Sequence, residues 1–143
     1  MDMAESTGAS RFDRVVDAGR LSNAMERALA HGEGRAVVLI ELQEAEDPVI
    51  AAAEARIVRT VRPSDMIGRL RRDRFAILAP TRGGLEHAQR LADRLSDRLG
   101  EPFHVGGKQV KLAARIGVAV GEGPADTAEK VLRRAEEAFD SPR

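Results

Sequence analysis

An almost continuous apolar run at residues 36–42 is the feature of this chain that most restricts its fold. The run follows a segment that contains Gly32 and Gly34, and its one charged residue is Glu41. A strand with one solvated face alternates apolar and polar residues, whereas a strand covered on both faces reads as an unbroken apolar run. The run therefore predicts a strand at the centre of a sheet, with other elements packed on both of its faces.

Apolar periodicity and breaking residues divide the rest of the chain into helices and strands. The predicted helices cover residues 12–18, 23–30, 47–61, 85–99 and 127–139, with a break at Gly19 and an N-cap at Asn23. The further predicted strands cover residues 66–70, 75–78, 102–105, 109–112 and 112–120. An antiparallel-rich central sheet flanked by helices and built around a split β-α-β core is the simplest arrangement of these elements. The chain is therefore expected in the α+β class.

The charge balance of the chain argues against one large class of functions. There are 23 Lys and Arg residues and 23 Asp and Glu residues, so the formal net charge is zero. A sequence-independent nucleic-acid binder needs a surplus of cations to displace counterions from phosphates, and we expect no nucleic-acid role. The chain has no cysteine, which removes disulfides and thiolate chemistry. No apolar run exceeds five residues, so we expect no membrane span and a cytoplasmic location.

Two motifs lie at a fixed spacing in the segment from residue 61 to residue 80. Arg62 and Asp65 form an Arg-x-x-Asp motif, and after five residues the predicted hairpin turn reads Arg71-Arg72-Asp73-Arg74-Phe75. This segment resembles the centre of a GGDEF domain, the diguanylate cyclase family, which joins two GTP molecules into cyclic di-GMP. The family pattern there is Arg-x-x-Asp, five residues, Gly-Gly-Asp/Glu-Glu-Phe and then an apolar strand.

The resemblance extends over most of the chain, from about Asp17 to Arg143. The segments 101–107, 114–119 and 132–139 are similar to the family's late hairpin, its Ser-Ile-Gly-Val-Ala strand and its last helix. The resemblance implies a nucleotide-cyclase-like fold with a split β-α-β, ferredoxin-like palm. We accordingly expect an N-terminal tail and the start of a lead helix at residues 1–16, and a degenerate GGDEF domain at residues 17–143.

The departures from the family pattern fall on residues that perform its chemistry. Arg71 and Arg72 replace two glycines that let the backbone approach GTP. Arg74 replaces a glutamate that helps to hold magnesium, and Glu41 corresponds to the other metal-binding residue, an aspartate. Magnesium needs oxygen ligands, and a guanidinium group has none.

The loop that holds guanine in the family, directly after the first strand, has no full counterpart here. Asp47 matches the guanine-contacting aspartate by its position, but the matching asparagine is absent. Base, metal and phosphate contacts are therefore all weakened, and two metal ions that position phosphates are the centre of this chemistry. We predict no catalytic residue, no metal site, no cofactor and no enzymatic activity.

A second site of the family is retained in residue type and spacing. Arg62 and Asp65 resemble its allosteric inhibitory site, which binds the product cyclic di-GMP away from the catalytic pocket. A second half-site uses arginines of the following helix, and Arg90 and Arg94 fall at matching positions on one helical face. Arginine bonds phosphate oxygens bidentately and stacks on guanine, while a carboxylate accepts from the N–H edge of guanine. These four residues are the predicted binding site for cyclic di-GMP.

Other interpretations of the same residues stay open. An isolated Arg-x-x-Asp motif is more often an ion pair at a helix end, and Arg90 and Arg94 can belong to a solvated helix face with Glu86 and Asp97. The basic cluster at residues 69–74 can meet phosphate. The histidines are scattered along the sequence, which favours surface positions over a metal site: His31, His87 and His104.

The leading hypothesis is a non-catalytic GGDEF-like domain that binds cyclic di-GMP through the Arg-x-x-Asp site and acts as a signalling receptor or regulator. The alternative is a ligand-free pseudoenzyme that serves as a protein-interaction or dimerisation module. A residual enzyme or GTP-binding domain is the third hypothesis. We expect a homodimer that the two-fold symmetric ligand can induce, and a downstream protein partner of unknown identity.

Overall fold

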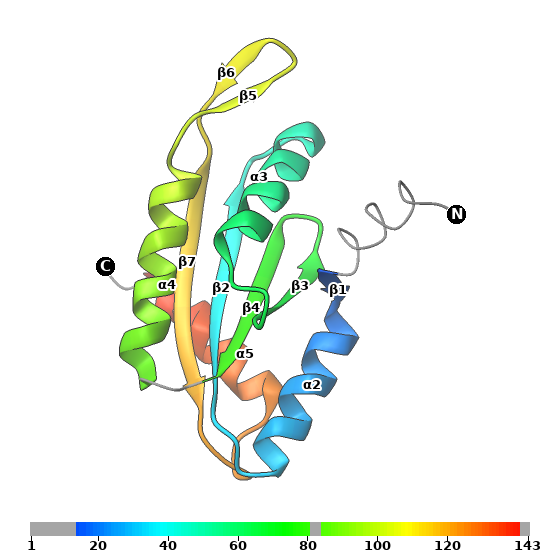
Figure 1. Ribbon diagram of the computed structural model, residues 1–143, viewed down its shortest axis with the longest axis vertical. Coiled ribbons are helices and arrows are strands. Elements are labelled where there is room, and N and C mark those ends of the chain that lie inside the picture. The colour runs from blue at the N-terminus through cyan, green and yellow to red at the C-terminus, as the bar shows by residue number, and fades with distance from the viewer. Residues whose placement is uncertain (1–13, 81–83, 141–143) are drawn as a thin grey trace.

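The computed structural model describes residues 14–80 and 84–140, which form a five-stranded sheet with helices on both faces and a two-stranded hairpin (Figure 1). The strands are β1 (Val15–Asp17), β2 (Arg35–Gln43), β3 (Met66–Arg71), β4 (Arg74–Pro80), β5 (Phe103–Val105), β6 (Lys108–Val110) and β7 (Ala113–Gly121). The helices are α2 (Ala18–Ala30), α3 (Asp47–Thr60), α4 (Gly84–Leu99) and α5 (Ala128–Glu137), followed by the 3-10 helix η1 (Ala138–Asp140). None of the helices within these ranges is long and apolar enough to cross a membrane.

Strand β2 lies inside the sheet, as its apolar sequence predicts. The strand order is β1-β3-β4-β2-β7, with β2 antiparallel to both β4 and β7, and β1 parallel to β3. Residues 36–40 of β2 are all buried, because helices cover both faces of the strand. Near the end of β2, Glu41 lies opposite Arg74 of β4 and opposite Arg115 of β7. The strand register therefore places one carboxylate between two arginines.

The two faces of the sheet have separate apolar cores. Helices α3 and α4 cover one face (Figure 1). Ile57, Phe75 and Leu95 are buried together on that face. Helices α2 and α5 cover the opposite face, around Leu21 and Leu39. The sheet is thus the middle of three layers, and the α+β fold class predicted from the sequence is confirmed.

The N-terminal region differs from the predicted helix at residues 12–18, of which residues 12 and 13 lie outside the described residues. Residues 15–17 form strand β1, and helix α2 begins only at Ala18. The prediction that a lead helix starts within residues 1–16 is therefore wrong for residues 15 and 16. Asp17 caps α2, because its carboxylate accepts a hydrogen bond from the backbone N–H of Arg20 at 2.8 Å. Asn23, the predicted N-cap, and Gly19, the predicted break, both lie inside the helix. Backbone pairing with the distant strand β3 decides this region, and no local pattern contains that information.

Both predicted hairpins are confirmed. Strands β3 and β4 are joined by a turn at Arg72 and Asp73, and strands β5 and β6 by Gly106 and Gly107. The two glycines have φ angles of 60° and 76°. Two successive residues with positive φ give a turn whose twist matches that of the hairpin strands, and glycine adopts this conformation without a steric penalty.

Arg56 on α3 connects the end of α4 to the β5–β6 hairpin. Its guanidinium group donates hydrogen bonds to the backbone oxygens of Arg98 at 2.9 Å, Glu101 at 2.6 Å and Pro102 at 3.0 Å. The same group stacks on the ring of Phe103, with Cζ 3.6 Å from the ring centre. The carbonyl of Arg98, in the last turn of α4, also accepts a hydrogen bond from the N–H of Glu101 at 3.2 Å, so Arg56 reinforces the end of this helix.

Candidate functional site

The degenerate motif at residues 71–75 forms the tip of the β3–β4 hairpin. Arg71 ends β3 and pairs with Arg74 at the start of β4, which leaves Arg72 and Asp73 as the turn. The backbone oxygen of Asp73 accepts a hydrogen bond of 2.8 Å from the N–H of Leu42 near the end of β2. The tip of the hairpin is thus fixed against the strand that carries Glu41.

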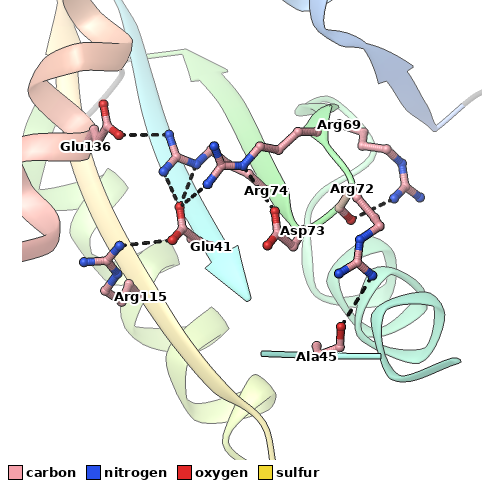
Figure 2. Close-up of polar contacts among 9 residues, drawn as sticks. Glu41, Ala45, Arg69, Arg72, Asp73, Arg74, Arg115 and Glu136 are labelled. Carbon is pink, nitrogen blue, oxygen red and sulfur yellow. Dashed lines mark hydrogen bonds and ion pairs between the residues drawn. The ribbon is translucent and has the colours of Figure 1, made fainter. Parts of the chain in front are cut away.

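Glu41 is the centre of a set of ion pairs beside this tip, here called the Glu41 network (Figure 2). Its Oε1 atom accepts hydrogen bonds from Nε and Nη2 of Arg74, the first at 2.9 Å, and from Nη2 of Arg71 at 3.1 Å. Its Oε2 atom accepts one from Nη2 of Arg115 at 3.0 Å. Arg74 also donates from Nη1 to Oε2 of Glu136 on α5, at 3.2 Å. The network joins four strands and a helix around one carboxylate.

The two central side chains of the Glu41 network are largely withdrawn from solvent, with 12% of Glu41 and 14% of Arg74 exposed. Burial raises the pKa of Glu41, but the hydrogen bonds from Arg74 and Arg115 lower it by more, so the pKa lies below its ordinary value. Burial lowers the pKa of Arg74, and the hydrogen bonds to Glu41 and Glu136 raise it by more. Both groups are therefore charged at neutral pH.

The Glu41 network occupies the positions at which the resemblance implies metal ligands. Glu41 and Arg74 correspond to the two acidic ligands, and here they are bonded to each other. A guanidinium group offers N–H donors and no oxygen, so this donor set does not fit a magnesium ion. Among the described residues, no group of three or more His, Cys, Asp or Glu side chains is arranged to hold a metal ion.

Arg72 extends from the hairpin tip to the start of α3. Its Nη1 atom pairs with the carboxylate of Asp47. The same atom lies 3.5 Å from the backbone oxygen of Ala45 (Figure 2). The resemblance matches Asp47 to the family's guanine-contacting aspartate, and in this structure Asp47 is paired with Arg72. A depression of about 680 Å³ lies beside this pair, and nine residues line it: Asp47, Ile50, Ala51, Ala52, Glu54, Ala55, Val58, Arg69 and Arg72.

Arg62 and Asp65 are the ends of a tight turn between α3 and β3, here called the RxxD turn (residues 62–65). The N–H of Asp65 donates to the backbone oxygen of Arg62 at 3.0 Å. Arg62 is exposed, whereas Asp65 is 4% exposed and is the one buried polar or charged residue in the part of the chain that the structure describes. Burial raises the pKa of Asp65 above its ordinary value, although a backbone hydrogen bond from Arg62 and the charges of Arg62, His87 and Arg14 oppose the increase.

Arg90 and Arg94 are exposed side chains of α4. Arg90 pairs with Glu86 one helical turn away, with 4.0 Å between Nη1 and Oε1. Helix α4 packs against α3, the helix that leads into the RxxD turn, and the charge of His87 on α4 opposes the increase in the pKa of Asp65. Binding of ligand by Arg90 and Arg94 stays a prediction. The sequence analysis predicted only a surface position for His87. Its spacing of three residues from Arg90 indicates in addition that both lie on one face of the helix.

Comparisons with known sequences agree with the resemblance. Residues 43–142 match the family model for the diguanylate cyclase GGDEF domain. The diguanylate cyclase TpbB of Pseudomonas aeruginosa is 32% identical over 140 residues, which cover 89% of this chain and 32% of TpbB. The response regulator PleD of Caulobacter vibrioides is 28% identical over 133 residues, which cover 83% of this chain and 29% of PleD. The chain thus spans about a third of the length of these relatives.

Solved structures agree with the sequence matches. The GGDEF domain of TpbB from Pseudomonas aeruginosa superposes with a TM-score of 0.73 at 29% identity, over 86% of each chain. The GGDEF domain of DgcB from Caulobacter crescentus, solved in complex with c-di-GMP, superposes with a TM-score of 0.75 over 87% of this chain and 81% of that chain. Its identity is 14%, so it shows the likeness of the fold alone. By sequence and by fold, this chain belongs to the GGDEF domain family of diguanylate cyclases.

Proposed function

We propose that this GGDEF domain is a non-catalytic receptor for cyclic di-GMP, which it binds with Arg62, Asp65, Arg90 and Arg94. The burial of Asp65 is the observation that carries the proposal. A buried carboxylate is unfavourable unless donors or cations surround it, and the raised pKa of Asp65 indicates that the protein alone compensates its charge incompletely. The N–H groups along a guanine edge can add donors to the backbone hydrogen bond from Arg62 that this carboxylate already accepts.

The cations around the RxxD turn support the same ligand. Arg62 is exposed and lies on the same turn as Asp65, so its planar group can bond a phosphate or stack on a base next to the carboxylate. Arg90 and Arg94 add two exposed cations on α4, the helix that packs against α3. A ligand with two guanines and two phosphates matches this combination of one acceptor and several guanidinium groups.

The ion pairs of two carboxylates, Glu41 and Asp47, support the absence of catalysis. Glu41 is bonded to arginines rather than left open for magnesium, whereas Asp47 is paired with Arg72 at an exposed position and adds less to the argument. Phosphoryl transfer depends on metal ions that bridge and neutralise the phosphates, and the cation of Arg74 repels such ions at this position. The domain is therefore proposed to bind the family's product without making it.

Isothermal titration calorimetry with cyclic di-GMP, and separately with GTP and Mg²⁺, tests the proposal. We expect binding of cyclic di-GMP that weakens at high salt, and no binding of GTP. Arg62→Ala and Asp65→Ala should each lower the affinity by roughly tens to thousands of fold, as truncation of one member of a desolvated charge pair does. Arg98→Ala removes an exposed arginine further along α4 and is the matched control, which should bind like the parent.

Two results would overturn the proposal. Absence of heat at high micromolar cyclic di-GMP would exclude the receptor role and favour the interaction or dimerisation module. Unchanged affinity in Arg62→Ala would exclude the assigned site. Light scattering with and without the ligand tests whether its two-fold symmetry joins two copies of the domain, which we expect.

A further inference from the structure

Arg14, the residue before β1, binds the backbone of the RxxD turn. Its Nη1 atom donates hydrogen bonds to the carbonyl oxygens of Pro63 at 3.3 Å and Asp65 at 3.0 Å, and its Nη2 atom donates to that of Arg62 at 3.1 Å. These partners lie 48 to 51 positions away in the sequence. One guanidinium group thus holds three of the four carbonyls of the turn in a fixed arrangement.

The position of Arg14 depends on strand β1. Strand β1 lies beside β3 (Figure 1). Val15 pairs with Ile67 and Asp17 with Arg69 in parallel register, so the residue before β1 lies near the residues before β3. Strand β1 has three residues and lies at the edge of the sheet. A short edge strand has few backbone hydrogen bonds and opens at a lower free energy than the central strands. Opening of β1 would carry Arg14 away from the RxxD turn.

We infer that Arg14 is a positioning residue for the cyclic di-GMP site, and that docking of β1 and binding of ligand at the RxxD turn favour each other. The inference rests on the proposed function of that site. By fixing the turn, Arg14 fixes the orientation of Arg62 relative to Asp65, the two groups that must meet the ligand together. A preorganised site loses less conformational entropy on binding, which increases its affinity. The two effects are thermodynamically linked. The factor by which docking of β1 increases the affinity for the ligand is also the factor by which the bound ligand increases the equilibrium constant for docking of β1.

A direct phosphate contact is the other role that an arginine at this place can have. The three carbonyl contacts engage both terminal nitrogens of Arg14, which are the atoms that a bidentate phosphate contact needs. Arg14 is also half-buried, whereas Arg62 is exposed. Both observations favour positioning over direct contact. A phosphate contact adds to the salt dependence of binding and a positioning contact does not, so the two roles are separable by measurement.

Amide hydrogen exchange of the ligand-free protein tests the positioning role directly. Arg14→Ala should accelerate exchange at Asp65, whose N–H closes the RxxD turn, and at Val15 in β1. Arg133→Ala removes an exposed arginine of α5, on the opposite face of the sheet, and is the matched control. Arg14→Lys keeps the charge but not the planar fork, and should show an intermediate rate. Wild-type exchange at Asp65 in Arg14→Ala, with native far-UV circular dichroism, would overturn the inference.

Calorimetry with cyclic di-GMP tests the effect on binding. Arg14→Ala should lower the affinity about tenfold, a factor typical of coupled sites, and keep the wild-type slope of affinity against salt. A reduced slope would make Arg14 a phosphate contact and overturn the positioning role. Saturating ligand should slow exchange at residues 15–17 of the wild-type protein, and unchanged exchange there would exclude the coupling. If the wild-type protein binds no cyclic di-GMP, the proposed function fails, while the exchange of the ligand-free variants still decides whether Arg14 orders the turn.

Discussion

Glu41→Gln removes the one negative charge on which three guanidinium groups converge (Figure 2). The variant leaves Arg71, Arg74 and Arg115 directed at a neutral amide. Removing one partner of a buried ion pair typically costs about 3–5 kcal/mol, because the remaining charge stays desolvated. Since 12% of Glu41 and 14% of Arg74 remain exposed, solvent screens part of this effect. We expect the free energy of unfolding to fall by about 2–3 kcal/mol.

Urea unfolding followed by far-UV circular dichroism is the suitable assay, because the chain has no Trp or Tyr for fluorescence. Glu129→Gln is the matched control. It removes the same charge from the pair with Arg133 on α5, where 60% of the arginine and 82% of the glutamate are exposed. This control should change the free energy of unfolding by less than about 0.5 kcal/mol. A Glu41→Gln protein as stable as the control, or more stable than wild type, would refute the reasoning.

The pH dependence of the stability difference between wild type and Glu41→Gln distinguishes the loss of the charge from poor packing of the amide. The pKa of Glu41 is lower in the folded protein than in the unfolded chain. Its stabilisation is therefore present above the unfolded pKa of about 4.3 and is lost as the pH falls through the folded pKa. Wild type and Glu41→Gln should converge in stability in acid. A difference that persists there would mean that the amide fails to pack, and would contradict the ionic explanation.

Incubation with GTP and Mg²⁺ or Mn²⁺ should yield no cyclic di-GMP above a protein-free control. The triple variant Arg71→Gly, Arg72→Gly, Arg74→Glu should also stay inactive, because the guanine-binding loop is missing. Detection of cyclic di-GMP by chromatography in either experiment would contradict the corresponding prediction. Asp65→Asn should increase the free energy of unfolding at pH 7 but not in acid, as measured by urea unfolding. The pKa of Asp65 is raised in the folded protein, so the stability of the wild type falls as the pH rises through that pKa. A variant less stable than wild type at pH 7 would show that the charge of Asp65 is needed for folding. Arg56→Ala should lower the free energy of unfolding by about 2–3 kcal/mol, because it removes three hydrogen bonds from a charged donor and a stacking contact with Phe103. An unchanged urea midpoint would show that Arg56 does not stabilise the connection between α4 and the β5–β6 hairpin.

Local sequence patterns determined most elements of this domain beyond its N-terminal region, and the resemblance to the GGDEF family supplied its candidate site residues. The unbroken apolar run identifies β2 as a covered strand, and Gly106 and Gly107 identify a tight hairpin, because each signal depends on chemistry inside one element. The spacing between Arg62 and Phe75 located the RxxD turn and the β3–β4 hairpin before any contact was known. Strand β2 and the two hairpins are confirmed, because backbone preference and burial pattern agree with the final fold, while ligand binding at the RxxD turn stays a prediction.

The tertiary structure alone decided which side chains meet. Phe12, Val15 and Val16 have helical spacing in the sequence, yet residues 15–17 form a strand because β3 supplies their backbone partners. Glu41 was identified as a replaced metal ligand, but its bonds to three arginines follow from the register that sets β4 and β7 on either side of β2. Arg14 meets the RxxD turn from 48 to 51 positions away. Periodicity and turn chemistry act over a few residues, whereas long-range pairing depends on the whole chain. The sequence therefore showed which residue types are available for a site, and only the fold determined which of them are partners.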